Sequence, residues 1–379
     1  MHLVVRSPLK NNFIATDTVA GIPWCFRPLF IWMRIMGIDL YHPTSRKSIR
    51  RYGLVMLLLG TWAHIDNNLD TFRKLLSNKL SASATLDWNI GIDYVNNFGF
   101  IVLVSHQIFY VAGNQWLLLW GHVVKFDLDY CRFHHKLLRK LLLIGFLSPL
   151  LEICNTLFIF SSILPDFAKD STYRKCITVL AFFSKILPIS ALVLYCSVAW
   201  LSSLFYEEIR KDIYYTKVIN EKNIRKWKCS LVLAGNVVDG INDTFGLILL
   251  ISVTHFYVDL ISHLFYTWNN ISSLTRLGAT IYLVNVLRKL VFFWFIVWTP
   301  TEIYRKAFKV ATLLRKINGV QFHLQKQVHF LALDTFKNLP QISSLGYFDV
   351  NLRLIPKLIG TILTYLVILY QFQSSEKKP

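Results

Sequence analysis

Seven apolar stretches recur along this sequence, and each meets or approaches the roughly 20 residues that a helix needs to cross a bilayer core of about 30 Å. They lie approximately at residues 51–69, 90–120, 137–164, 176–205, 243–268, 279–299 and 351–372. Hydrophobic residues make up 54% of the 379 residues and charged residues only 17%, whereas a soluble chain of this length carries far more charge. The sequence therefore predicts an all-α membrane protein with seven transmembrane helices.

Lysine and arginine are distributed unevenly over the segments between these stretches. Of the 41 Lys and Arg residues, 27 lie in one alternating set of segments, which includes the N-terminus, and 9 lie in the other set. Because basic residues are retained on the cytoplasmic side, we expect a cytosolic N-terminus and an extracellular C-terminus. This orientation is opposite to that of G-protein-coupled receptors and excludes that class. It also accounts for the formal net charge of +19 without a nucleic-acid partner.

The two long cytosolic segments between the later spans are patterned as helices. Apolar residues near spacings of three and four recur in the second segment, namely Leu313, Leu314, Ile317, Val320, Leu324, Val328, Leu331 and Leu333. This pattern predicts helices that extend below the membrane and pack with one another or with neighbouring subunits. Residues 26–40 mix apolar residues with Arg27 and Arg34, which is typical of a helix lying in the membrane interface.

Motifs for metal, cofactor and enzyme chemistry are lacking in the sequence. The six cysteines include no CxxC pair, although a single bridge between Cys154 and Cys176 stays open. The eleven histidines form no HxxHH or HExxH cluster, so we expect no metal, no cofactor and no enzymatic activity. The first 25 residues lack the apolar core of a cleavable signal peptide. A sequon at Asn270 falls on the expected extracellular side and is the candidate glycosylation site, whereas one at Asn242 falls on the cytosolic side.

Polar residues within the expected spans are the candidates for ligand binding. His255, Asp259 and His263 recur at four-residue intervals and so share one face of a helix, where they could hold a metal, line a hydrated pocket or pair internally. Glu152 and Lys185 are intramembrane charges that could pair with each other or contact a ligand. Aromatic residues suit either membrane interfaces or stacking against a planar or sugar-like ligand. The candidate ligand-binding residues are Trp88, Tyr94, Glu152, Phe158, His255, Asp259, Tyr266, Trp268 and Tyr282.

The last apolar stretch carries two neighbouring stripes at helical spacing. They are Thr364, Ile368 and Gln371, and Tyr365, Leu369 and Phe372. A buried Gln371 near the end of an apolar helix is costly unless it meets water or a partner. Several copies around an axis would form a polar ring there, with Ile368 and Phe372 as a hydrophobic constriction. A hydrogen bond to a neighbouring helix, or a place in the headgroup region, would satisfy Gln371 equally well.

The end of the chain resembles the C-terminal signature of the insect gustatory receptor family, in which Thr-Tyr, five hydrophobic residues and Gln-Phe follow one another. The residues that match are Thr364-Tyr365 and Gln371-Phe372, and the preceding segment from Gly346 to Asn351 resembles the family's upstream element. The resemblance implies a ligand-gated, non-selective cation channel. It further implies a tetramer, either of identical chains or with related receptors. The expected pore residues are Thr364, Tyr365, Ile368, Gln371 and Phe372.

The resemblance also assigns roles to the segments of the chain. Residues 1–50 form a cytosolic N-terminal segment with an interfacial helix, and residues 51–205 form spans 1–4 and the ligand-pocket part. Residues 206–241 and 300–350 form a cytosolic anchor, residues 242–299 hold spans 5–6, and residues 351–379 form the pore helix and a short extracellular tail.

The implied ligand is a small extracellular tastant, and the implied location is the plasma membrane of a sensory dendrite. Sugar-branch receptors commonly carry Glu where this chain has Leu366, which favours a bitter or other plant compound or a fructose-type sugar. The expected partners are therefore the tastant, membrane lipid, permeant cations and related subunits. An odorant-receptor channel of the same superfamily is an alternative. A secondary transporter is a weaker one, because no internal inverted repeat is evident.

Overall fold

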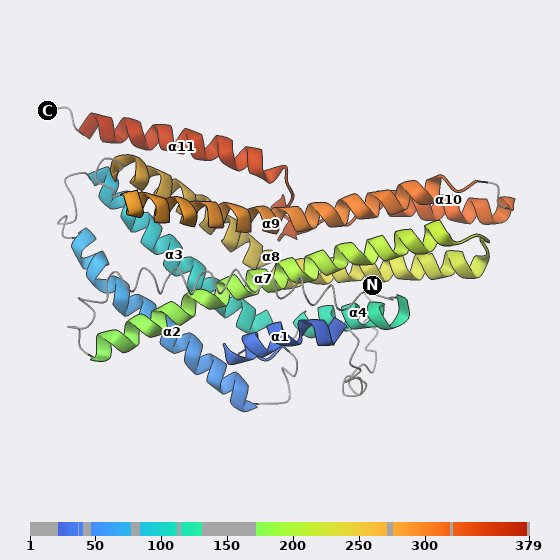
Figure 1. Cartoon of the computed structure of the whole chain (residues 1–379), viewed down its shortest axis with the longest axis horizontal. Coiled ribbons are helices and arrows are strands. Elements are labelled where there is room, and N and C mark those ends of the chain that lie inside the picture. The colour runs from blue at the N-terminus through green and yellow to red at the C-terminus, as the bar shows by residue number, and fades with distance from the viewer. Residues whose placement is uncertain are drawn as a thin grey trace, which may run out of the picture.

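The computed structural model describes residues 22–36, 38–40, 47–76, 84–111, 115–130, 172–270, 276–318 and 321–376. Over these residues the fold is helical, with one small two-stranded hairpin (Figure 1). The elements are α1 (Ile22–Ile35), α2 (Lys47–Leu76), α3 (Ala84–Val111), α4 (Gln115–Tyr130), α7 (Thr172–Tyr215), α8 (Glu221–Asn270), α9 (Arg276–Arg315), α10 (Phe322–Lys337), β1 (Ser343–Ser344), β2 (Phe348–Asp349) and α11 (Leu354–Glu376).

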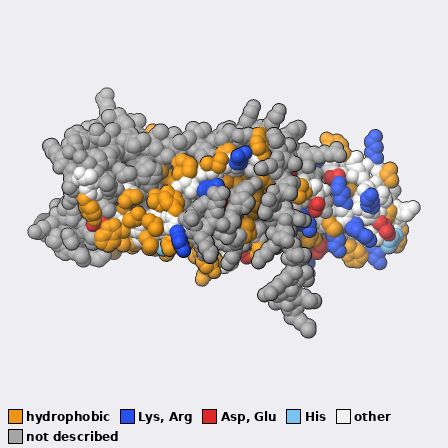
Figure 2. Space-filling model, turned by 90° about the horizontal axis from the view of Figure 1, so that it is seen from below, with side chains coloured by type: hydrophobic (Ala, Val, Ile, Leu, Met, Phe, Trp, Pro, Cys, Tyr) orange, Lys and Arg blue, Asp and Glu red, His pale blue; other side chains and the backbone are white. Residues whose placement is uncertain are grey.

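Helices α7, α8 and α9 are much longer than a bilayer requires. They contain 44, 50 and 40 residues, whereas about 20 suffice to cross the hydrocarbon core. Their ends run together with α10 to one end of the molecule, away from α11 (Figure 1). The helical extensions predicted from the apolar spacing are therefore present. On the face shown in Figure 2, charged side chains gather at this same end, and the described side chains on the rest of the face are mainly hydrophobic.

Specific polar contacts hold the first turn of this extended end. Asn220 caps α8, because its side-chain Oδ1 accepts a hydrogen bond of 2.9 Å from the backbone N–H of Asn223. Asp212 on α7 accepts hydrogen bonds from Lys226 and from the indole N–H of Trp227 on α8, at 2.9 and 3.0 Å. These contacts connect the two antiparallel helices across the short link between Tyr215 and Glu221.

Packing between α9 and α10 confirms most of the predicted apolar pattern. Leu314, Leu324, Val328 and Leu331 are all buried in the main hydrophobic core. Leu333 is 51% exposed on this chain because it lies on the opposite side of α10 from Val328 and Leu331, so its packing with a neighbouring subunit stays a prediction. Val320 lies outside the described residues.

The number of membrane spans is only partly visible. Among the described residues, α7, α8 and α11 are long and apolar enough to cross a membrane, and the α3–α4 pair would add a fourth if it forms one span. The expected single stretch at residues 90–120 is divided between α3 and α4, which meet at an angle of 64°. The expected third span at residues 137–164 lies outside the described residues. Seven spans and the orientation of the termini thus stay predictions.

Helix α1 covers most of the segment for which an interfacial helix is predicted. It buries one face against α4 and α7, and its aromatic side chains meet those of α4. The Phe26 and Trp120 rings lie 5.3 Å apart, and the Phe30 and Trp116 rings 6.0 Å apart, both edge to face. Trp32 donates a hydrogen bond of 2.9 Å to Ser190 on α7. The position of α1 relative to a membrane stays a prediction.

A proline in α9 is accommodated by a tyrosine from α7. Pro300 has no backbone N–H, so the carbonyl of Ile296, one turn earlier, loses its helical partner. The hydroxyl of Tyr195 lies 3.3 Å from this carbonyl oxygen and donates a hydrogen bond to it. Tyr195 is fully buried, and α7 and α9 pack closely along their length. The tyrosine therefore stabilises a helix that the proline would otherwise leave with an unpaired buried carbonyl.

Candidate functional site

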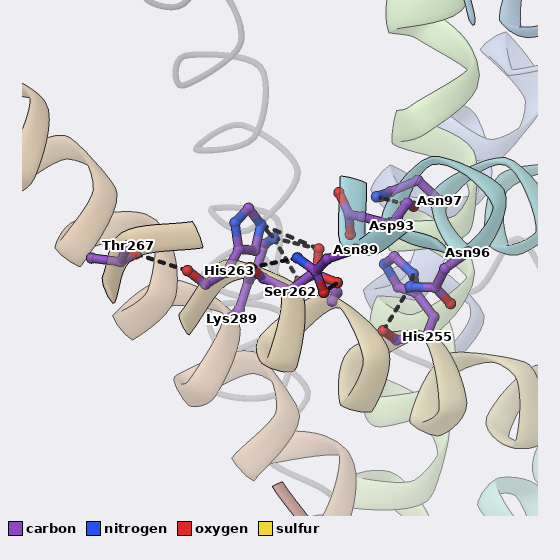
Figure 3. Close-up of polar contacts among 10 residues, drawn as sticks. Asn89, Asp93, Asn96, Asn97, His255, Ser262, His263, Thr267 and Lys289 are labelled. Carbon is purple, nitrogen blue, oxygen red and sulfur yellow. Dashed lines mark hydrogen bonds and ion pairs between the residues drawn. The ribbon is translucent and has the colours of Figure 1, made fainter. Parts of the chain in front are cut away.

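A buried ion pair connects α8 to α9 (Figure 3). Asp259 on α8 is 2% exposed, and the ammonium of Lys289 on α9 lies 2.9 and 2.7 Å from its two carboxylate oxygens. Nε2 of His263, one turn along α8, lies 2.7 Å from the same ammonium. The same Nε2 lies 3.3 Å from Asp259 Oδ1, so His263 contacts both partners of the ion pair. The predicted internal pairing therefore holds for Asp259 and His263.

His255 has a different partner although it lies on the same stripe. Its ring stacks on Phe100 of α3, with centroids 4.0 Å apart and planes inclined by 8°. Nδ2 of Asn96 lies 3.0 Å from His255 Nδ1 and donates a hydrogen bond of 3.1 Å to the His255 backbone carbonyl. The stripe of His255, Asp259 and His263 thus connects α8 to two different neighbours. The described residues contain no group of three or more His, Cys, Asp and Glu side chains that could hold a metal ion, so the metal alternative has no geometric support.

Two further asparagines of α3 lie at this contact (Figure 3). Asn89 donates to the backbone carbonyl of Ser262 and accepts from its hydroxyl, at 3.4 Å each. Asn97 donates a hydrogen bond of 2.9 Å to the backbone carbonyl of Asp93. Both amides are therefore committed to the contact between α3 and α8 or to α3 itself.

Asp93 is a polar residue at this site that the sequence analysis did not identify. Its Oδ1 is buried and accepts no hydrogen bond from the described residues. The available signal was the spacing of Asn89, Asp93, Asn96 and Asn97, which places polar side chains on one face of α3. We call the seven side chains of Asn89, Asp93, Asn96, His255, Asp259, His263 and Lys289 the polar cluster.

The other candidate ligand-binding residues are more scattered. Tyr94 is half-buried on α3 next to Asp93, whereas Tyr266 and Trp268 are exposed near the end of α8. Trp268 meets Tyr370 of α11 edge to face, with ring centroids 6.2 Å apart. Trp88 and Tyr282 lie on α3 and α9 and Asn270 ends α8, but their side chains fall outside the described part. Glu152 and Phe158 also lie outside it, as does Cys154 of the bridge considered with Cys176.

One face of α11 packs against α8. Ile362 is 5% exposed and clusters with Leu260 and Ile261. The Tyr365 ring meets the Tyr257 ring edge to face, with centroids 6.2 Å apart. Tyr365, one of the expected pore residues, therefore contacts the chain's own α8 and lies at the border of the packed face.

The other face of α11 is exposed on this chain. Thr364, Ile368, Gln371 and Phe372 all lie on it, so the stripe of Thr364, Ile368 and Gln371 is turned away from α8. Gln373, two residues beyond Gln371, is 6% exposed and lies on the packed side. Helix α11 thus carries one glutamine on each side, and only the outward one belongs to the sequence signature.

A tight hairpin precedes α11. In this hairpin β1 and β2 pair antiparallel, and the turn between them places Leu345 at φ 51° and Gly346 at φ 79°. Positive φ at two successive residues matches the type I′ turn that suits β-hairpins, and glycine adopts it without strain. The segment from Gly346 to Asn351, which matches the family's upstream element, therefore contains the second half of this hairpin.

Helices α8 and α9 hold the hairpin by its backbone. Asn242 of α8 donates a hydrogen bond of 3.0 Å to the Gln341 carbonyl and accepts one of 3.0 Å from the Ser343 N–H. Ser344 donates to the carbonyl of Gly246, also on α8, at 3.2 Å, and the Leu352 N–H donates to Thr301 Oγ1 of α9 at 3.0 Å. We call the hairpin and these side chains the hairpin mount. The Asn242 amide is already engaged here, which does not suit its sequon for a glycan.

A backbone contact makes the hairpin mount tight. A Cβ atom at Gly246 would lie 3.3 Å from the backbone nitrogen of Leu345, closer than most side-chain contacts allow. Glycine at this position therefore lets the turn rest directly on α8.

A separate apolar pocket lies where α1, α2, α3 and α7 meet. It holds about 560 Å³ of empty space, part of it open to the exterior. The lining residues are Met36, Ile38, Gly53, Met56, Leu57, Gly60, Thr61, Ile101, Ser105, Phe109, Leu180 and Leu187. None of the candidate ligand-binding residues is among them. Ile101, the lining residue of α3 nearest to Asp93, lies about 12 Å along the helix from Asp93, and the lining contains no residue of the polar cluster.

Comparison with known proteins shows a family match in sequence and a similar fold among solved structures. Residues 26–376 match a family model described as 7tm chemosensory receptor. The fold is similar to two structures of the insect olfactory receptor OR5 from Machilis hrabei, one of them in complex with eugenol. The eugenol complex has a TM-score of 0.69 and 14% sequence identity, covering 92% of this chain and 97% of that one. The second structure has a TM-score of 0.69 and 13% identity, covering 91% and 97%. A search of curated proteins finds no match.

Proposed function

Because this chain belongs to the 7tm chemosensory receptor family, we propose that it is a gustatory-type receptor. In this proposal it acts as a ligand-gated, non-selective cation channel that a small extracellular tastant opens. The observation that carries the proposal is α11, an apolar helix of spanning length whose outward face bears Thr364, Ile368, Gln371 and Phe372.

Four copies of the chain around one axis would give this outward face a function. Gln371 would form a polar ring in the water-filled path, and Ile368 and Phe372 would narrow that path with apolar side chains. A single chain leaves the amide of Gln371 facing lipid, which is costly. We therefore assign pore lining to the outward stripe. Tyr365, which touches Tyr257, would lie beside the pore and connect it to α8.

The proposed orientation follows the distribution of charge. The extended ends of α7, α8 and α9, together with α10, would lie in the cytosol as an anchor, and seven spans would cross the plasma membrane. The polar cluster would then lie toward the extracellular side, where a tastant arrives. Helices α3, α8 and α9 contribute to it, and α11 packs on α8 beside it. This adjacency supports the assignment of His255, Asp259 and their neighbours to ligand recognition.

An odorant-receptor channel is the second candidate. The similarity in fold to an olfactory receptor whose structure contains eugenol favours a small, mainly apolar ligand. The complete Thr-Tyr and Gln-Phe ending at Thr364 and Phe372 favours the gustatory branch, and Leu366 favours a bitter or other plant compound over most sugars.

Expression in cells without chemoreceptors of their own tests the proposal. Whole-cell currents should follow application of some sugars, bitter compounds or volatile phenols, and they should persist when G-protein signalling is blocked. Currents that disappear under that block would refute a channel formed by the receptor itself.

Gln371→Glu and Gln373→Glu form a matched pair on one helix. A carboxylate about 4 Å from a permeating ion in water contributes about 1 kcal/mol per ion charge, so the ring of four Gln371→Glu side chains should raise the preference for Ca²⁺ over Na⁺ by at least about fivefold. Gln373→Glu, on the packed side, should leave this preference unchanged in the channels that reach the surface. Reversal potentials measure the difference. Equal selectivity in both variants and the wild type would remove Gln371 from the pore.

A further inference from the structure

One oxygen of the Asp93 carboxylate, Oδ1, has no donor among the described residues although many polar side chains surround it. Asn89 is paired with Ser262, Asn96 with His255, and Asn97 with a backbone carbonyl of its own helix. The nearby lysine, Lys289, is held by both oxygens of Asp259 and by His263. Each donor of the polar cluster is thus committed elsewhere, and Asp93 Oδ1 is buried without a hydrogen bond from the described residues.

The ionisable neighbours of Asp93 on α8 and α9 contact one another. Lys289 and Asp259 form an ion pair of 2.7 Å, and Nε2 of His263 lies 3.3 Å from Asp259. A buried carboxylate oxygen without a hydrogen bond is costly, so a donor from outside the chain would be bound at Asp93 Oδ1.

We propose that Asp93 binds the protonated amine of a small organic ligand, which makes this receptor responsive to amine compounds. This inference rests on the proposed function and specifies the ligand class of the same site. An ammonium supplies the hydrogen-bond donor that Oδ1 lacks and makes a charge-assisted hydrogen bond with the carboxylate. Asp93 is half-buried, so part of the residue faces the outside of the packed helices.

The test uses matched probe pairs on the full-length chain. Each pair contains a protonatable tertiary amine and an uncharged analogue with carbon in place of nitrogen, for example N,N-dimethyl-2-phenylethylamine and 3-methylbutylbenzene. The variants are Asp93→Asn, which keeps the shape and removes the charge, and Asp93→Glu, which keeps the charge. Asp129→Asn, at an exposed position on α4, serves as the charge-removal control.

We expect amines to open the wild-type channel and to need at least about tenfold higher concentration in Asp93→Asn, which is typical for loss of a charge-assisted hydrogen bond. Uncharged agonists should shift by less than about threefold, Asp93→Glu should retain part of the amine response, and Asp129→Asn should behave as wild type. Amine responses unchanged in Asp93→Asn, or a wild-type channel opened only by uncharged compounds, would overturn the inference and leave the proposed function intact.

A second readout does not depend on current. Millimolar amine should raise the melting temperature of the detergent-purified wild-type protein and should not raise that of Asp93→Asn, since only a bound ligand stabilises the folded state. If this difference appears while no compound produces current at verified surface expression, the binding site stands and the channel function fails. If neither melting temperature responds to any amine of the panel, the binding site fails.

Discussion

The contact between Tyr195 and the Pro300 turn offers a sharp test of how α7 and α9 are held together. Replacing Tyr195 by Phe removes the hydrogen bond that takes the place of the one Pro300 cannot make to the Ile296 carbonyl. An unpaired buried carbonyl costs about 1–3 kcal/mol, and the 3.3 Å distance places this bond toward the weaker end, at about 1–2 kcal/mol. With an unfolding entropy of about 2.1 cal/mol/K per residue, such a loss lowers the melting temperature by about 1–3 °C.

The same loss should vanish when the proline is replaced. In Pro300→Ala, residue 300 regains a backbone N–H that bonds to the Ile296 carbonyl, so Tyr195→Phe in that background should cost close to nothing. The assay is thermal unfolding of detergent-purified protein for the wild type, the two single variants and the double variant, analysed as a double-mutant cycle. Tyr206→Phe, at a second buried tyrosine of α7, is the control and should cost the same in both backgrounds. An equal cost of Tyr195→Phe with and without Pro300 would refute the reasoning.

Two further variants test the other polar contacts. Asn242→Ala removes two hydrogen bonds to the hairpin backbone, together about 2 kcal/mol, and should reduce the maximal ligand-evoked current at equal surface expression. Asn242→Asp keeps the acceptor and should reduce this current less. Unchanged currents in both variants would show that the hairpin needs no support from α8. Lys289→Met leaves Asp259 buried without its ion-pair partner, at a cost of about 3–5 kcal/mol, and should lower the fraction of protein at the cell surface. The double variant Asp259→Asn with Lys289→Met should recover much of that surface fraction in a biotinylation assay. A surface fraction as low in the double variant as in Lys289→Met would contradict the ion-pair explanation.

Hydrophobic pattern predicted most helices of the described chain because burial and lipid contact act on whole faces of a helix. The extensions of α7, α8 and α9 and the helix α10 follow from apolar spacing of three and four. The spacing does not say which apolar residues pack within the chain and which lie on its outer side, as Leu333 does. The division of residues 90–120 into α3 and α4 was also missed, because composition alone does not reveal a bend between two apolar helices.

The polar cluster shows that the spacing of residues along one helix does not identify their partners on other helices. The spacing of His255, Asp259 and His263 correctly placed them on one face, but it does not say which neighbouring helix each residue meets. His255 pairs with Asn96 on α3, whereas Asp259 and His263 meet Lys289 on α9. Partners of this kind are set by how distant helices pack, so they follow only from the three-dimensional arrangement. The pairing of Glu152 with Lys185 stays a prediction.

The length and continuity of α8 have a mechanical consequence. The helix contains no proline, and Asn242 and Asp259 lie about 26 Å apart along it. A tilt of about 5° pivoting at Asp259 displaces Asn242 by about 2 Å, more than a hydrogen bond of 3.0 Å tolerates. The hairpin must then either follow the helix or lose its contacts. A tilt of the α8 segment between Asn242 and Asp259 would therefore strain both the polar cluster and the hairpin that precedes α11.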